Sequence, residues 1–396
     1  MKKLIITSLM AGICLQIQAQ NHIEALRYSG KKFGSTAKSM AIGGAVGALG
    51  ADISSASVNP ASLAQYKKGE FSFSLGFIGN QNTSTYFNNQ VTDNTFKLNI
   101  PNAGLVFVNK SHVGKGKKGW KNSTIAFNAA RVADFTRVVN FSGTNTSSSL
   151  MDYFAERANG YSIAQIRATD DDFDNGFSSK TTMAWEGYLI DSVGDRKYAA
   201  NASPIFHDIT QKGVTTQSGG MYEYNMSYAG NYSDIFYLGG TLTYTSVKFK
   251  EARSHTEIND PRNNGNQVVN NFIYSENLTT TGGGWSAQMG LVICPVKFVR
   301  LGASLQTPMV LKLNDSYNFS LNSNLNNGEN YNYKSKDGSY SYKLQTPFRY
   351  NFSAVVVAGK LGFISGDFES VDYSAARLRS NDGNTAQAME TANDGI

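Results

Sequence analysis

From residue 70 onward, apolar and polar residues alternate with a period of two. Apolar side chains share one parity in the first such stretch, and serine and glycine fill the other; the apolar members are Phe71, Phe73, Leu75 and Phe77. Successive side chains of a strand point to opposite faces, so this pattern predicts a strand with one apolar and one small polar face. The pattern recurs at residues 98–109, 124–129, 222–228, 236–245 and 299–306. The sequence therefore predicts an all-β chain.

A soluble β-sandwich alternates as well, but three features favour a transmembrane antiparallel β-barrel. The strands are about 10 residues or longer, the length that crosses a bilayer when tilted. Their polar parity carries Thr, Ser, Asn and even Arg300, and no stretch offers a second sheet or a helix layer. Charged residues make up 17% of the chain and aromatic residues 12%, which suits an uncharged polar lumen between aromatic girdles.

The predicted connections fall into two classes. Short ones at residues 230–233, 294–296 and 358–360 are expected to be periplasmic turns, and long polar ones are expected outside the cell, at residues 79–94, 144–218, 251–267 and 314–338. Long loops on one side and tight turns on the other are typical of outer-membrane barrels. We assign residues 69–396 to the barrel.

The N-terminus predicts export. Lys2 and Lys3 precede an apolar run at residues 4–15 that is too short to cross a bilayer as a helix, so residues 1–19 are expected to be a signal peptide. Cleavage would leave Cys294 as the only cysteine, which excludes an intrachain disulfide. The net charge of +6 is scattered along the chain, an argument against a nucleic-acid partner.

Residues 38–66 are small, nearly uncharged and rich in Gly, Ala and Ser. Such residues let backbone approach backbone closely, and Asn59-Pro60 is a turn signal. The pattern is compatible with a small packed helix and turn of any secreted domain or with a compact plug. Residues 21–32, of mixed charge, are expected to be an extended arm, so that residues 20–68 form one N-terminal unit.

The same segment resembles a known family. Met40-Ala-x-Gly-Gly-Ala45, followed by Val58-Asn-Pro-Ala-Ser-Leu-Ala64, is similar to the N-terminal hatch of the FadL/TodX family of outer-membrane transporters for long-chain fatty acids and other hydrophobic compounds. The resemblance implies a barrel of fourteen strands whose lumen is plugged by this hatch. It also implies roles for two sets of hatch residues, flexible Gly43, Gly44 and Gly47 and anchoring Asn59, Pro60 and Ala61.

Two further stretches share this resemblance. Arg131, Asp134 and Phe135 are similar to the family's third strand, where a bend can open a lateral gap in the wall. Residues 343–350 and 366–373 are similar to its later hairpins. The chain departs from the family at its end, because about nine strands are complete by Tyr373 and a polar tail follows at residues 377–396. We therefore expect a C-terminally incomplete barrel.

The longest connection contains a predicted helix. Residues 147–157 begin with Ser and Asp near a helix start, and apolar residues follow at helical spacing: Leu150, Tyr153, Phe154 and Ala158. This apolar face can pack against the barrel mouth as a lid. Alternatively, as the resemblance implies, it forms a landing groove for ligand, with Leu150, Met151, Tyr153 and Phe154 as its residues.

No arrangement of catalytic residues is present in the sequence. It contains no nucleophile elbow, zincin motif, phosphate-binding loop or cysteine pair for a metal. The histidines are expected at the surface, and the acidic run at residues 170–174 reads as a solvated loop or a weak calcium site; the histidines are His22, His112, His207 and His255. We expect no enzyme, cofactor or metal; a barrel-embedded lipid hydrolase would need a Ser and a His within reach of each other.

These observations lead to one expected function and two alternatives. We expect a monomeric channel in the cell outer membrane, in contact with its lipid, for passive uptake of hydrophobic small molecules such as long-chain fatty acids, gated by the hatch. The first alternative is a non-transporting barrel that acts as a receptor or scaffold in an envelope complex. The second is uptake of heme or another aromatic compound.

Overall fold

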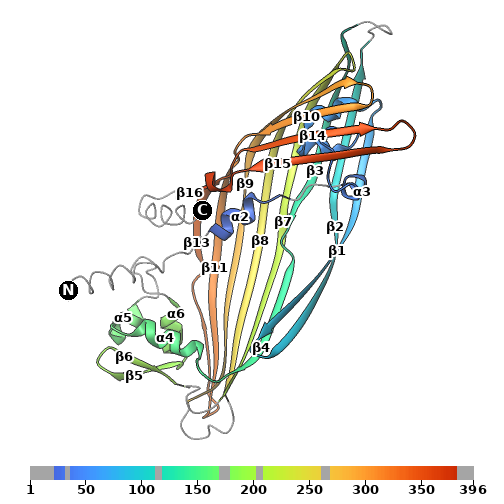
Figure 1. Ribbon diagram of the computed structural model, residues 1–396. Coiled ribbons are helices and arrows are strands. Elements are labelled where there is room, and N and C mark those ends of the chain that lie inside the picture. The colour runs from blue at the N-terminus through green and yellow to red at the C-terminus, as the bar shows by residue number, and fades with distance from the viewer. Residues whose placement is uncertain are drawn as a thin grey trace, which may run out of the picture.

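The computed structural model describes residues 22–31, 36–111, 118–168, 179–201, 208–259 and 268–380. The predicted signal peptide, His112, His207 and the acidic run at residues 170–174 lie outside these ranges. The described chain is built around one large curled antiparallel sheet (Figure 1). This outcome confirms the all-β prediction.

Nine strands follow one another along the sheet in the order β1-β2-β3-β7-β8-β9-β10-β14-β15, and five further strands pair beside this row: β4, β11, β12, β13 and β16. Among the described residues β1 pairs only with β2 and β15 only with β14, so these two strands are its free edges. The bounds are β1 Glu70–Tyr86, β2 Asn89–Lys110, β3 Trp120–Asp134, β4 Arg137–Asn145, β7 Ile209–Tyr232, β8 Phe236–Asn259, β9 Val269–Val296, β10 Val299–Gln306, β11 Val310–Leu325, β12 Asn330–Lys334, β13 Gly338–Gln345, β14 Arg349–Val357, β15 Phe363–Val371 and β16 Arg377–Ser380.

Two Thr-Pro steps interrupt neighbouring strands and crease the sheet. Proline has no N–H to donate to a ladder, so β10 ends before Pro308 and β13 before Pro347. In both places the threonine hydroxyl accepts from an N–H of the facing chain where the ladder is interrupted: Thr307 Oγ1 accepts from the N–H of Ala287 at 3.0 Å, and Thr346 Oγ1 accepts from that of Met309 at 3.0 Å. Beyond the crease β11 and β13 continue in a different direction from β10 and β14 (Figure 1).

The two faces of the sheet have opposite chemistry. Large apolar side chains stand exposed on the convex face, among them Phe73, Phe107, Met226, Leu301 and Phe352. Small polar side chains are buried on the concave face, among them Asn102, Asn225, Thr241, Gln288 and Ser304. A soluble sheet would bury its apolar face instead, so the distribution is inverted relative to an ordinary core. The predicted alternation is confirmed, although within residues 98–109 the parity changes at an irregularity opposite Ser74 and Gly76, so that Leu98 and Leu105 are both exposed.

Several predicted loops are in fact strand. Residues 79–94 form the ends of β1 and β2, which turn at Tyr86–Asn89, and β8 and β11 likewise run on through parts of the other long connections. Polar residues occupy both faces there, so the sequence shows no apolar–polar alternation that would predict a strand. The polar tail was also expected to have no strand, but β16 begins at Arg377 and pairs with β13.

The N-terminal arm is helical rather than extended. Helix α2, His22–Ser29, lies within the curl of the sheet (Figure 1), and it buries Ala25 and Tyr28 one turn apart against the concave face. Its apolar face is only these two residues wide, so mixed charge dominated the sequence pattern. Three short helices follow at α3 Ala37–Ala41, η1 Ile53–Ser57 and η2 Pro60–Gln65.

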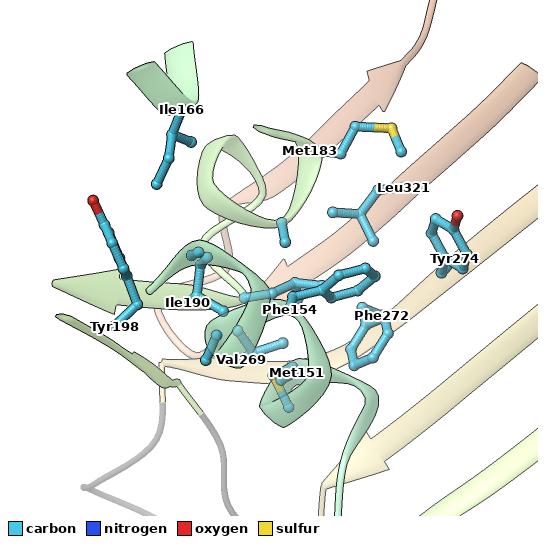
Figure 2. Packing of buried hydrophobic residues seen from close by; sticks show 14 of the residues in the cluster. Met151, Phe154, Ile166, Met183, Ile190, Tyr198, Val269, Phe272, Tyr274 and Leu321 are labelled. Carbon is cyan, nitrogen blue, oxygen red and sulfur yellow. The ribbon is translucent and has the colours of Figure 1, made fainter. Parts of the chain in front are cut away.

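A small subdomain lies at the end of the sheet opposite the short turns (Figure 1). It contains three helices and a two-stranded hairpin, α4 Leu150–Ala158, α5 Ile163–Ala168, α6 Ser179–Glu186, β5 Ile190–Gly194 and β6 Lys197–Ala200. Its buried residues pack on Phe272 and Leu321, at the ends of β9 and β11 (Figure 2). A final 3₁₀ turn, η5 Tyr373–Ala375, joins β15 to β16.

Candidate functional site

Residues 36–66, here called the packed segment, form a compact unit on the concave face of the sheet. Each of its three short helices starts with a side-chain cap: Thr36 accepts from Ser39 N, Asp52 from Ser54 N and Asn59 from Ala61 N. Such caps satisfy backbone N–H groups that have no partner within the helix. Thr36 also donates to Asp52 at 2.9 Å, which ties α3 to η1. The sequence therefore gives the packed segment its own internal order.

Side chains of the wall satisfy the remaining backbone groups of the packed segment. Six strands contribute hydrogen bonds: Asn122 of β3 to Ala64 O (2.9 Å), Asn225 of β7 to Ser57 Oγ (3.0 Å), Thr241 of β8 to Ala56 O (3.1 Å), Gln288 of β9 to Val58 O (2.7 Å), Ser304 of β10 to Val58 O (2.6 Å) and Gly47 N to Asp367 of β15 (2.9 Å). A buried carbonyl left without a partner is costly, so these bonds fix the position of the packed segment.

Glycines of the wall form a close-fitting seat for Asn59 and Pro60. A Cβ atom added at Gly239 of β8 would lie 2.6 Å from Pro60, and one at Gly290 of β9 would lie 2.0 Å from Asn59 Oδ1. At Gly302 of β10 it would lie 3.0 Å from Asn59 Nδ2. Asn59 also donates to Leu291 O at 3.2 Å. Sequence analysis did not identify these wall glycines, since isolated glycines in strands carry no signal of what they face.

The segment glycines predicted to flex differ in their environments. Gly43 and Gly44 have φ values of 67° and 83°, a left-handed conformation that favours glycine. Gly47 is confined instead, because a Cβ atom there would lie 2.1 Å from Ser353 Oγ. Pro60 and Ala61 are buried in η2 against the seat. The structure thus brings Gly47 and the Asn59–Ala61 turn together on the wall and leaves Gly43 and Gly44 in a turn after α3.

Helix α2 occupies a second, apolar part of the concave face. Ala25 and Tyr28 join a buried cluster whose wall members include Met221, Val247 and Leu311. Glu24 lies beside this cluster, where burial raises its pKa to about 7, with the charge of Asp315 as the next cause. No hydrogen bond from the described residues reaches Glu24 Oε2. This part of the concave face is therefore held mainly by apolar contacts.

Buried charged side chains of the wall hold Ser29, at the end of α2, and Lys31, which follows it. Lys31 pairs with Glu223 of β7, with side chains only 7% and 2% exposed, and also donates to Gln306 at 3.2 Å. Arg349 of β14 donates to Ser29 O and pairs with Glu369 of β15 at 2.8 Å. Removing one partner of such a buried pair leaves an uncompensated charge. The last residue of α2 and the two residues that follow it are thus held by buried charges of the wall.

Arg131, Asp134 and Phe135, for which the resemblance implied a bend in the wall, lie at an interruption between β3 and β4. β3 ends at Asp134 and β4 begins at Arg137, and Arg131 pairs with Asp134 at 2.6 Å in a buried position. Arg131 Nη2 also donates to Gly219 O at 2.9 Å. Phe135 turns inward and packs edge-on against Tyr28 of α2, with ring centroids 6.1 Å apart.

A cavity of about 470 Å³ adjoins this break. The backbone ladder between β2 and β3 ends at the pair Asn102 and Ala130, and beyond it side chains of β1 bond to β4 instead, as Asn82 does to Val138 O at 2.9 Å. Lining residues include Met40 of α3, Phe77, Asn99, Arg131 and Phe135. Asn99 is 8% exposed, and its Oδ1 has no hydrogen-bond partner among the described residues. The cavity thus connects α3 to the interrupted part of the wall.

Of the four residues predicted to form a landing groove, two are fully buried. Met151 and Phe154 are 0% and 1% exposed within the core of the small subdomain (Figure 2), while Leu150 packs at its edge. Tyr153, expected on the same buried face, is 44% exposed. The helix itself is confirmed, with a capping box between Ser149 and Asp152. In this structure its apolar face contributes to the subdomain core.

One carboxylate joins the small subdomain to the sheet. Glu257 of β8, 1% exposed, accepts from Leu150 N at 2.8 Å and from Gln211 at 2.7 Å, and it also accepts from Ser149 Oγ. His255, expected at the surface, lies 3.0 Å from the same carboxylate. Both Ser149 and His255 thus contact Glu257, and the histidine does not contact the serine hydroxyl as a base for a serine nucleophile would.

Among the described residues there is no cluster of three or more His, Cys, Asp and Glu side chains that could hold a metal ion. None of the helices in the described ranges is long and apolar enough to span a membrane. Comparisons with family models, with curated proteins and with solved structures found no match to this chain.

Proposed function

We propose that this chain forms the wall of an outer-membrane channel through which hydrophobic small molecules, such as long-chain fatty acids, enter passively. The packed segment would be the plug of this channel, as in the FadL/TodX family that its sequence resembles. The physical problem is that an apolar solute crosses the outer leaflet slowly and gains nothing from a water-filled pore. A wall with an apolar outside and a plugged inside offers such a solute a protected route.

The observation that carries this proposal is the inverted sheet with the packed segment bonded to its concave face. Exposed apolar side chains over much of the convex face, among them Phe73, Met226 and Phe352, would be costly in water and favourable in lipid. Small polar groups inside are used to hold backbone, through bonds from six strands. An inner segment held by many weak bonds can shift in steps without unfolding the wall.

The cavity at the break in β3 suggests where a solute would leave. It reaches from Met40 of α3 to the stretch where β2 and β4 lack a shared backbone ladder. Side-chain bonds such as that of Asn82 are easier to exchange than a strand ladder, because each can be remade without moving the backbone. We propose that a solute passes sideways into the bilayer between β2 and β4, with Arg131 and Asp134 holding the edges of the gap.

Deletion of residues 39–63 tests the plug. In planar bilayers the deleted protein is expected to conduct small ions far better than the full chain, because the concave face would lose its packed filling. A matched control deletes residues 22–28 of α2, which leaves Ser29, Lys31 and the packed segment in place and is expected to change conductance little. Equal conductance of the full chain and the 39–63 deletion would contradict a plug.

A receptor or scaffold role is the second candidate, and one observation favours it. The small subdomain has a closed core in which Met151 and Phe154 are fully buried, so it presents a rigid outer surface instead of an open groove. Uptake of a labelled fatty acid into proteoliposomes separates the two roles. No uptake above that of protein-free liposomes would favour the receptor.

A further inference from the structure

Three cations stand directly opposite one another on the convex face. Lys312 of β11 pairs in register with Lys343 of β13, and Lys343 pairs in register with Arg379 of β16. Their strand neighbours Leu311, Leu344 and Leu378 are buried on the concave face, so the three cations point outward. Directly opposite residues of an antiparallel pair lie about 5 Å apart, and like charges at such positions are destabilising.

Nothing on this face neutralises the three cations. The outward positions of the described strands β8, β9, β11, β13 and β16 contain no Asp or Glu, because their acidic residues, such as Glu251, Glu276 and Asp315, have the inward parity. Lys248 and Lys250 of β8 have the outward parity as well. None of these lysines forms an ion pair with a described residue. Like charges therefore face one another across this part of the sheet with no acidic side chain of the described residues to neutralise them. This arrangement points to an external anion.

The neighbouring row of the sheet indicates where these cations lie relative to a membrane. Tyr224, Tyr244 and Trp285 stand side by side on β7, β8 and β9, with ring centroids 6.5 Å and 5.1 Å apart. Aromatic rows of this kind lie at the membrane–water interface of β-barrels. Lys312 pairs with Gly283, two residues beyond Trp285, a step of about 7 Å along a strand. Its side is the one that carries the small subdomain.

We propose that Lys312, Lys343 and Arg379 bind the phosphate groups of a phosphorylated lipid headgroup in the outer leaflet. This inference rests on the part of the proposed function that places the wall in a membrane. Charge-assisted bonds to phosphate suit both lysine and arginine. The Tyr244 hydroxyl adds a donor, since it lies over Gly283, where an added Cβ atom would be 2.5 Å away. The site would fix the depth of the wall in the bilayer and recruit a shell of anionic lipid.

The experiment compares the full chain with a triple variant, Lys312→Gln, Lys343→Gln and Arg379→Gln, in bilayers of phosphatidylcholine with and without lipid A. Retained lipid A is counted by native mass spectrometry, and thermal unfolding is followed by gel mobility. The full chain is expected to retain lipid A about a hundredfold more tightly than the triple variant, from three interfacial cations. In pure phosphatidylcholine the triple variant is expected to be as stable as the full chain or more stable, because the like charges are gone.

A matched control removes the same charge elsewhere. Lys67→Gln, Lys68→Gln and Lys297→Gln change exposed lysines at the short-turn end, and lipid A retention is expected to stay unchanged. Equal retention by the triple variant and the full chain would overturn the inference, as would an equal stabilisation of both by lipid A. If inorganic phosphate in pure phosphatidylcholine stabilised the full chain as much as lipid A does, a lipid site would be contradicted. Failure to insert into either bilayer would overturn the membrane wall itself, whereas insertion without lipid preference would overturn only this site.

Discussion

The two N-terminal elements inside the curled sheet are held by different forces. The packed segment is bonded to polar side chains of six strands and rests on wall glycines. Helix α2 contributes Ala25 and Tyr28 to an apolar cluster, and its Glu24 oxygen finds no hydrogen-bond partner among the described residues. Hydrogen bonds are directional and specify one position, while apolar contacts are non-directional. We infer that the packed segment has one specified resting position, and that α2 is displaced more easily.

The buried charged contacts of Ser29 and Lys31 lie between α2 and the packed segment, so that either element can move without moving the other. Ser29, the last residue of α2, is bonded to β14, and Lys31 is paired with β7, so residues 22–28 can leave the apolar cluster without moving the packed segment.

Glu223→Gln removes the partner of Lys31 and leaves a buried cation. Breaking a buried pair in this way costs about 3–5 kcal/mol, so the midpoint of chemical denaturation should fall strongly. The double variant Glu223→Gln/Lys31→Met removes both charges and is expected to recover most of the loss. If the single variant were as stable as the parent, the Lys31–Glu223 pair would not anchor the chain between α2 and the packed segment.

A change of pH should release α2 but not the packed segment. The Glu24 carboxyl ionises near 4.5 when free and near 7 when α2 is seated. The seated state therefore binds the proton more tightly, so seating is strongest below about pH 4.5 and weakens as pH rises through 7, by about 3 kcal/mol at most. Amide hydrogen exchange at pH 6 and pH 8, corrected for intrinsic rate, measures this for residues 22–29.

Two comparisons sharpen the pH result. Glu24→Gln has no carboxyl to ionise, so α2 should stay protected at pH 8. The packed segment should show the same protection at both pH values in either protein. A pH-dependent loss of protection in the packed segment, or its persistence for α2 in Glu24→Gln, would contradict the assignment.

Gly290→Val blocks the seat of the packed segment and leaves α2 untouched. The added Cβ would lie 2.0 Å from Asn59 Oδ1, and overpacking of this kind costs about 1–3 kcal/mol. Conductance in planar bilayers should rise as the segment is displaced. Gly366→Val is the matched control, since nothing lies within 4 Å of a Cβ atom there; equal conductance of the two variants would count against the seat.

Tyr28→Phe should have the smallest effect. The Tyr28 hydroxyl is buried beside the Thr280 hydroxyl and has no other hydrogen-bond partner among the described residues, so removing the Tyr28 hydroxyl is expected to cost little. Hydrogen exchange of α2 is expected to be unchanged or slower. Faster exchange would show that the hydroxyl holds α2 by a polar contact, against the division drawn here.

The sequence predicted the faces of the sheet better than its boundaries. Side-chain direction in a strand depends only on parity, so Phe71 to Phe77 and Tyr224 to Tyr228 could be assigned to the convex face before any contact was known. The extent of β1 and β2 could not be predicted in the same way. Beyond Phe77 both parities become polar, and a pairing such as Thr83 with Thr92 leaves no trace in the pattern.

The candidate site was predictable where it depends on local chemistry. Asn59-Pro60 predicted a turn, where the structure has a capped 3₁₀ helix, and the resemblance implied a bend near Asp134, where β3 ends. Its long-range partners were not predictable: Gly290 and Gly302 lie more than 200 residues from Asn59 in the chain, and only the fold brings them together. The same holds for Lys312, Lys343 and Arg379, which become neighbours through strand register alone.

The central claim is that the convex face meets lipid. A variant with Trp120→Phe and Trp185→Phe keeps only Trp285, which is 60% exposed on β9. In bilayers of phosphatidylcholine brominated along its acyl chains, the fluorescence of Trp285 should be strongly quenched, whereas a variant that keeps only Trp185 of the small subdomain should not be. Equal fluorescence of Trp285 in brominated and plain lipid would contradict the account.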